Sequence, residues 1–158
     1  MFFVVSVTKK YRLQQVVHMD KYVSILRDRD ITVTPQRIAV LRYLDHHRTH
    51  PDADTIYEEL KQDNPSLSKT TIYNTLDMLR QHDLVKVLTI GTKFRYDFNL
   101  RPHHHFRCRR CGAIIDIPQQ DGHLDCMDTD GHRIDEVHVY LKGICKTCLH
   151  KEKEENNG

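Results

Sequence analysis

The sequence predicts an α+β protein in two parts: a helical first half that ends in a β-hairpin, and a smaller second half that combines strands with a metal site. In the first half, apolar residues recur at helical spacing and then alternate with polar residues around Gly91–Thr92. Two Cys-x-x-C pairs then frame the second half, Cys108–Cys111 and Cys145–Cys148, with 33 residues between them.

Four helices are expected in the first half, because each segment places its apolar residues on one face. Thr34 and Asp52 precede two of these segments, where their side-chain oxygens can accept hydrogen bonds from the first turn. Pro35 suits the first helical position, since it needs no backbone N–H there. The expected helical segments are Lys21–Arg29, Pro35 to about His46, the residues after Asp52 through Asp63, and a helix that begins at Ser68.

The fourth helix has an apolar face, formed by Ile72, Leu76 and Leu79, and an opposite polar face. Short helices packed in this way form a helix-turn-helix pattern. Strands expected at Leu84–Thr89 and Lys93–Phe98 add a hairpin, which turns the pattern into a winged helix. The alternative is a generic helical domain whose polar face is solvated.

The second half is expected to contain short strands around the first cysteine pair and a third strand further along the chain. Glu136–Leu141 alternates Val137 and Val139 with polar residues, as a half-exposed strand does. Gln119–Asp130 is polar and is expected to hold one irregular helix. The strands flanking the first pair are expected at Phe106–Cys108 and Ile114–Ile117.

Size and composition indicate a soluble protein of one or two small domains. The chain has 158 residues, 29% of them charged, and no apolar run approaches the roughly 18 residues of a membrane span. The order of charges around its apolar start is wrong for a signal peptide, so a cytoplasmic location is expected. A net charge of +2 is small for a protein that binds nucleic acid by charge alone.

Four thiolates in two Cys-x-x-C pairs suit a closed tetrahedral zinc site, because each pair places two sulfurs on one tight turn. The alternatives are a thioredoxin-like redox pair or disulfides, although paired cysteines in a reducing cytosol more often bind metal. A zinc ion held by Cys108, Cys111, Cys145 and Cys148 has no open position, so the expected role is structural.

A second set of donors has different chemistry, since three imidazoles and two carboxylates suit Fe(II) or Mn(II). In an extended segment, His103 and His105 point to one face and His104 to the other. The alternative is that this histidine run is only a solvated basic stretch. The five candidate ligands are His50, Asp97, His103, His105 and Asp116.

These motifs together resemble the ferric uptake regulator (Fur) family over about residues 21–150. The resemblance implies a homodimeric repressor with an N-terminal winged helix and a C-terminal α/β dimerisation domain that contains a structural zinc site. The motifs are Thr34-Pro-Gln-Arg37, His50-Pro51 with Ala53-Asp54-x-Ile56-Tyr57, Thr71-Ile-Tyr-Asn74, Asp97-Phe98, His103-x-His105-x-x-Cys108-x-x-Cys111-Gly112 and Gly143-x-Cys145-x-x-Cys148.

By position, the resemblance implies that the thiolates hold structural zinc and that the five other donors form a regulatory Fe(II) or Mn(II) site at the domain hinge. Both carboxylate positions hold Asp, which is similar to the peroxide-sensing PerR branch. In that branch, iron-dependent reaction with peroxide oxidises a ligand imidazole, and the corresponding targets are His50 and His103. The alternatives are an iron- or zinc-uptake regulator without peroxide sensing, a non-haem iron enzyme, and a constitutive DNA-binding zinc protein.

The fourth helix is the expected reader of a double-stranded, palindromic DNA operator. Thr70, Tyr73 and Asn74 are expected to contact bases, and Ser68 and Lys69 lie nearer the phosphates. Packing under the wing is the alternative role for Tyr73. A third metal site from His104, His123 and His138 is left open, because the family's pattern places Val137 where a ligand would stand.

The expected organisation follows from these assignments. Metal binding would fix the angle between two domains and thereby match a dimer's recognition helices to operator half-sites. The ranges are an N-terminal extension over residues 1–20, a winged-helix domain over 21–98, a hinge over 99–102, a dimerisation domain over 103–150 and a disordered tail over 151–158.

Overall fold

A computed structural model describes residues 21–90, 93–99, 101–119, 130–134, 137 and 139–156. The chain separates into two compact units, residues 1–99 and 100–158. The expected N-terminal extension, the wing turn at Gly91–Thr92 and most of the expected irregular helix lie outside the described residues. Within those residues, no helix has the length and apolar character needed to cross a membrane.

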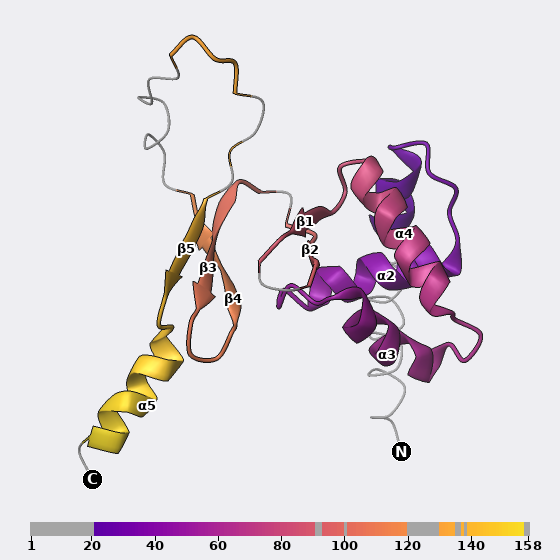
Figure 1. The fold of residues 1–158 in the computed structure, drawn as a ribbon. Helices are drawn as coiled ribbons and strands as arrows, with labels where there is room; N and C mark the ends of the chain where they lie inside the picture. Colours follow the sequence, from indigo (N-terminus) through magenta and orange to yellow (C-terminus); the bar gives the residue numbers. More distant parts are fainter. Residues whose placement is uncertain are drawn as a thin grey trace, which may run out of the picture. The chain divides into compact units, whose positions relative to one another are not determined.

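Helices dominate the first unit, and their starts follow the sequence (Figure 1). Residues 21–27 are helical. Each of the next three helices begins after a residue whose side-chain oxygen accepts a backbone N–H of the first turn: Thr34, Asp52 and Ser68. The helices are α2 (Pro35–His46), α3 (Ala53–Asp63) and α4 (Lys69–Gln81).

The core of the first unit forms where these helices pack together. Ile72, Leu76 and Leu79 of α4 are buried, as the apolar face of that helix predicts. They meet fully buried side chains from each of the other helices. Those partners include Tyr22, Leu26, Leu41 and Ile56.

A two-stranded wing follows α4. Strands β1 (Lys86–Leu88) and β2 (Arg95–Asp97) pair antiparallel, with Val87 opposite Tyr96. Both strands are shorter than the sequence predicts, although their positions match. The backbone N–H of Tyr96 donates to the Pro51 carbonyl at 3.0 Å, which ties the wing to the segment before α3. The first unit is therefore a winged helix-turn-helix.

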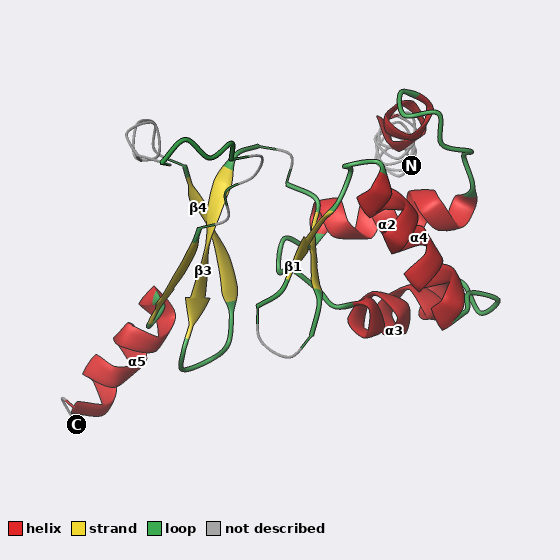
Figure 2. Cartoon of the chain, turned by 45° about the horizontal axis from the view of Figure 1, so that its top comes forward, coloured by secondary structure: helices red, strands yellow, loops and turns green. Residues whose placement is uncertain are grey.

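The second unit contains a three-stranded sheet (Figure 2), and its strand order is β4-β3-β5. The central strand β3 (His103–Cys108) pairs antiparallel with β4 (Ile114–Pro118) and parallel with β5 (Tyr140–Gly143). The third strand therefore lies later in the chain than the expected Glu136–Leu141. Its parallel pairing places Gly143 opposite Cys108 and so brings the second cysteine pair beside the first.

Helix α5 (Lys146–Asn156) overturns the expected disordered tail as far as residue 156. The charge of this segment and its Asn-Asn-Gly ending predict disorder, but they do not reveal its contacts with residues distant in the sequence. Arg110, in the turn after β3, pairs with Glu152 at 3.0 Å and Glu155 at 3.1 Å. It also donates to the Cys148 carbonyl at 3.3 Å. These contacts hold the acidic face of the helix against the cysteine loop.

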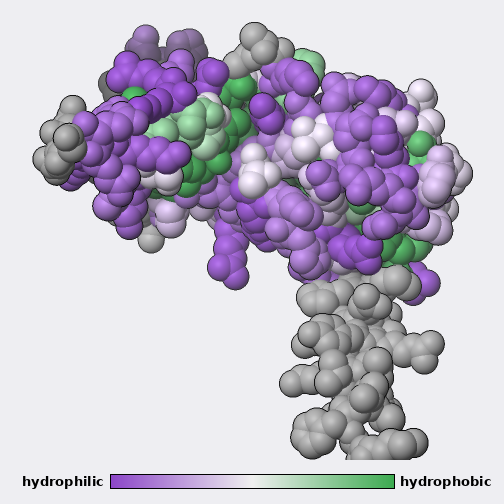
Figure 3. All heavy atoms as spheres, turned by 90° about the horizontal axis from the view of Figure 1, so that it is seen from below, coloured by the Kyte–Doolittle hydropathy of each residue, from purple (hydrophilic) through white to green (hydrophobic). Residues whose placement is uncertain are grey.

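The sheet of the second unit leaves large apolar side chains in solvent. Ile115 on β4 is 40% exposed and Leu141 on β5 is 43% exposed, and Val137, which precedes β5, is also exposed. A hydrophobic strip interrupts the otherwise hydrophilic surface of this unit (Figure 3). Among the described residues around β5, Val137 and Leu141 are therefore exposed, and an apolar strip of this kind marks an interaction surface.

Candidate metal centres and nucleic-acid interface

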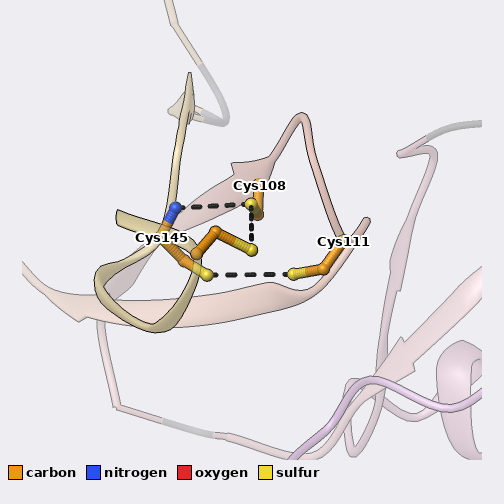
Figure 4. A group of neighbouring side chains, drawn as sticks. Cys108, Cys111 and Cys145 are labelled. Atoms are coloured by element: carbon orange, nitrogen blue, oxygen red, sulfur yellow. Dashed lines mark hydrogen bonds between the residues drawn. The ribbon is translucent and has the colours of Figure 1, made fainter. Parts of the chain in front are cut away.

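The four cysteines of the two pairs come together in the second unit. Figure 4 labels three of them, Cys108, Cys111 and Cys145. Cys108 ends β3 and Cys111 lies in the turn that follows, whereas Cys145 precedes α5 and Cys148 lies in its first turn. The Sγ atoms of Cys108 and Cys148 are 3.9 Å apart, and those of Cys111 and Cys145 are 3.8 Å apart. All four sulfurs lie within 4.8 Å of one another.

These distances fit one tetrahedral metal ion. A tetrahedron with zinc–sulfur bonds of about 2.3 Å has edges of about 3.8 Å. A disulfide needs a sulfur–sulfur distance of about 2.05 Å, and the four thiols are free in this structure. The disulfide alternative is therefore wrong, and the four thiolates fit a structural zinc site.

The backbone prepares this cluster to bind a cation. The N–H groups of Cys111 and Cys145 donate to the Cys108 sulfur and lower the pKa of that thiol to about 6. The lowered pKa favours the thiolate of Cys108, the form that binds metal. Burial has the opposite effect on Cys148 and raises the pKa of its thiol to about 12. A bound cation would favour the deprotonated form there.

A second group of donors lies at the other end of β3. His103 and His105 are two residues apart on this strand and point to the same face, and His105 stands opposite Asp116 of β4. The Nε2 atoms of the two histidines are 2.9 Å apart. Asp116 Oδ1 lies 3.6 Å from His103 Nε2 and 3.9 Å from His105 Nε2. Two imidazoles and a carboxylate thus converge on one point.

The hydrogen bond on the far side of the His103 ring decides which nitrogen can bind metal. His103 Nδ1 lies 2.7 Å from the Arg101 carbonyl oxygen, which can only accept. Nδ1 therefore carries the proton, and the lone pair of the neutral ring is on Nε2, the atom that faces His105 and Asp116. Orientation of a ligand histidine by a backbone carbonyl is the usual support of a metal site.

The two remaining candidate ligands lie together in the first unit. His50 Nε2 is 4.0 Å from Asp97 Oδ1, and both side chains are buried. Asp97 belongs to β2, and its carboxylate also accepts the backbone N–H of Asn99 at 2.7 Å. His50 has a φ of 53°, an uncommon conformation for a residue with a side chain. Burial and an unusual backbone together are typical of functional positions.

The residues predicted to meet DNA lie at the start of α4 and along it. Tyr73 is 48% exposed, and Thr70 and Asn74 are also exposed. Ser68 is occupied as the N-cap, because its Oγ accepts the Thr71 N–H at 3.0 Å. Lys69 reaches back to Asp54 on α3, with 2.9 Å between Nζ and Oδ1.

The structure adds an ion-pair network that sequence patterns did not predict. Lys93 of the wing pairs with Asp52 at 2.9 Å and Asp54 at 3.7 Å, and Asp54 also pairs with Lys69. Burial raises the pKa of the Asp52 carboxyl, but the Thr55 N–H and Lys93 outweigh burial and hold it at about 2. The sequence gives the charge of each residue but not the pairing, because these residues are brought together only by the fold.

The structure does not address every candidate from the sequence. His104 points away from its two neighbours, as the strand alternation predicts. His123 and His138, the other members of the possible third site, lie outside the described residues, and so does Cys126.

Comparisons with known proteins agree with these features. A model of the ferric uptake regulator family matches residues 28–141. The peroxide-responsive repressor PerR of Staphylococcus aureus (strain Mu50) is 39% identical over 142 residues, which cover 84% of this chain and 93% of that protein.

Solved structures show the same fold. The crystal structure of the Campylobacter jejuni peroxide stress regulator is similar with a TM-score of 0.61 at 28% identity, covering 93% of this chain and 100% of that chain. A zinc uptake regulator complexed with zinc and DNA is similar with a TM-score of 0.68 at 23% identity, covering 89% of this chain and 97% of that chain. The chain therefore belongs to the ferric uptake regulator family.

Proposed function

We propose that the protein is a metal-dependent transcriptional repressor that binds a double-stranded DNA operator as a homodimer and responds to Fe(II) or Mn(II). The observation that carries this proposal is the convergence of His103, His105 and Asp116 in a chain of this family. The Nε2 atoms of the two histidines are 2.9 Å apart. A relative of known structure is a zinc uptake regulator complexed with zinc and DNA, which supports DNA as the partner.

The donor sets support different metals at the two sites. Four thiolates favour zinc, and the fixed geometry of a closed site makes it structural. Imidazoles and carboxylates favour Fe(II) or Mn(II), which accept more than four ligands. Within the second unit, the three convergent donors leave coordination positions open. We assign the fourth and fifth ligands to His50 and Asp97, which are buried side by side in the first unit.

The proposed division of ligands explains how metal could control DNA binding. A metal ion shared by the two units would restrict how they move relative to each other, and the first unit carries α4. In a dimer, that restriction would set the spacing between two recognition helices and match it to half-sites about one helical turn apart. Metal and DNA would then each tighten the binding of the other. The exposed Ile115 and Leu141 support the dimer, since a second copy would cover them.

A DNA-binding titration tests this proposal. The protein, loaded with zinc, selects a duplex from a random library in the presence of Mn(II), and the affinity for that duplex is then measured with Mn(II) and with a chelator that leaves zinc bound. We expect binding about 5- to 150-fold tighter with Mn(II), the usual range of allosteric coupling. Equal affinity in both conditions would contradict a regulatory role for the metal.

We further propose that the regulatory site senses peroxide. Two features support this: both carboxylate positions hold aspartate, Asp97 and Asp116, and the 39% identical Staphylococcus aureus relative is a peroxide-responsive repressor. In the reaction proposed, one peroxide oxygen is added to a ligand imidazole and the other leaves as water. An oxidised imidazole is a poorer ligand, so metal and DNA would be released.

Mass spectrometry distinguishes this sensor from an uptake regulator of the same family. After treatment of the Fe(II)-loaded protein with hydrogen peroxide, we expect one added oxygen on a peptide that contains His50 or His103. The Mn(II)-loaded protein under the same conditions is the control and should stay unmodified. If both histidines stay unmodified with Fe(II) while Mn(II) still activates DNA binding, the protein is a metal-responsive regulator without peroxide sensing.

A further inference from the structure

A groove lies between the recognition helix and the wing of the first unit. It encloses a cavity of about 470 Å³. Tyr73, Asp77 and Arg80 line it from α4, and Val87 and Phe94 line it from the wing. The groove thus lies on the side of α4 that carries the predicted base-contacting residues.

Two aromatic side chains of this groove are exposed. Phe94 is 63% exposed and Tyr73 is 48% exposed. Tyr96, two residues beyond Phe94, is only 9% exposed and belongs to the core of the unit. Tyr96 therefore provides the wing with a buried aromatic side chain, and the exposed Phe94 ring is not needed for packing within the unit. An exposed aromatic beside a binding surface is a candidate for contact with a partner.

The polar groups of the groove do not repel a polyanion. The Asp77 carboxylate accepts from Arg80 Nη2 at 2.8 Å and from Gln81 Nε2 at 2.7 Å. Arg80 thus balances the charge of Asp77. The wing strands carry the exposed Lys86 and the half-buried Arg95, and their acidic residue, Asp97, is buried. Solvent-facing charge on the wing is therefore positive, which favours nucleic acid over an acidic protein surface.

The groove adjoins a second cavity on α4. Asn74 lines both, and the second cavity, of about 290 Å³, is also lined by Thr34, Arg37 and Thr71. A duplex seated on α4 would therefore face polar groups from one cavity and the aromatic pair from the other. The major groove admits a helix and presents thymine methyl groups to apolar side chains, and deoxyribose lies in the backbone along its edges.

We propose that Phe94, together with Tyr73, forms an apolar contact with deoxyribose and thymine methyl groups of the bound duplex. This inference rests on the proposed DNA-binding function and adds a contact from the wing. Such a contact contributes affinity without neutralising a phosphate. Its loss should therefore weaken binding by the same factor at every salt concentration, because the dependence of affinity on salt reflects the number of neutralised phosphates.

The test measures affinity by fluorescence anisotropy for the Mn(II)-loaded protein and the selected duplex, over a series of salt concentrations. We expect F94A to weaken binding about tenfold, because the variant removes the apolar surface of the ring from the contact. The slope of log affinity against log salt should stay unchanged. F94L should retain most of the affinity. K86A is the matched wing control and should reduce the slope by about 0.9 if Lys86 contacts a phosphate.

Each outcome decides the inference. Affinity of F94A equal to wild type overturns it, and so does a loss of affinity accompanied by a smaller salt slope. Because Phe94 is exposed, F94A should keep the wild-type melting temperature, and a thermal melt checks that any loss is not unfolding. If the wild-type protein does not bind DNA with or without Mn(II), the proposed function itself fails. If the wild type binds and F94A binds equally well, only this inference fails.

Discussion

Replacing Cys145 with serine is expected to release zinc and unfold the second unit. Among the described residues of that unit, a buried cluster consists of Cys108, Cys145 and Cys148, with Phe106 and Ile144 packed against it. The members of this cluster are mostly cysteines, so it depends on their sulfur atoms to oppose the conformational entropy of residues 100–158. Structural zinc provides an apparent binding free energy of about 10 kcal/mol or more in small zinc domains, which is comparable with the whole stability of a domain.

Zinc content and circular dichroism measure this effect. We expect C145S to retain much less than one zinc ion per chain and to lose the strand signal of the second unit, while the helical first unit stays folded. C126S is the matched cysteine-to-serine control, since Cys126 stands outside both pairs, and it should keep its zinc. A C145S protein with one zinc ion per chain and the melting profile of the wild type would contradict the structural role.

The helices of the first unit could be predicted because their signals are local. Thr34 and Asp52 cap the following helix through atoms three residues away, so the helix starts follow from short stretches of sequence. The same holds for His103 and His105, whose shared face follows from strand alternation. The cysteine spacing predicted the thiolate cluster, because each pair forms one tight turn.

The features that could not be predicted depend on partners distant in the sequence. Arg110 pairs with two glutamates of α5 that lie 42 and 45 residues further along the chain, and such partners cannot be read from the helix segment alone. The bounds of β5 depend on parallel pairing with β3, which a single strand's pattern does not specify. The hydrogen bond from His103 to the Arg101 carbonyl is local but depends on a ring orientation that the sequence does not give.

Replacing His105 with alanine is expected to abolish metal control of DNA binding. The variant removes one of the three convergent donors of the second unit. In the wild type, the Nε2 atom of His105 lies 2.9 Å from that of His103. The affinity for Mn(II) should fall by at least tenfold, because even the loss of a residue that only supports a metal ligand lowers metal affinity by about that factor. The winged helix itself is untouched, so weak DNA binding without metal should remain.

His104 provides a matched control on the same strand. Its side chain points to the other face of β3, and its cross-strand neighbour is Ile117 instead of Asp116. H104A makes the same chemical change one residue away from His105. It should therefore keep the wild-type response to Mn(II). Loss of the response in both variants would mean that the strand, and not the imidazole cluster, carries the effect.

The most direct test of the central claim is the ratio of DNA affinities with and without Mn(II), measured side by side for wild type, H105A and H104A with zinc bound in all three. We expect a ratio of about 5 to 150 for wild type and H104A and a ratio near 1 for H105A. A wild-type ratio near 1, or an H105A ratio equal to that of the wild type, would contradict it.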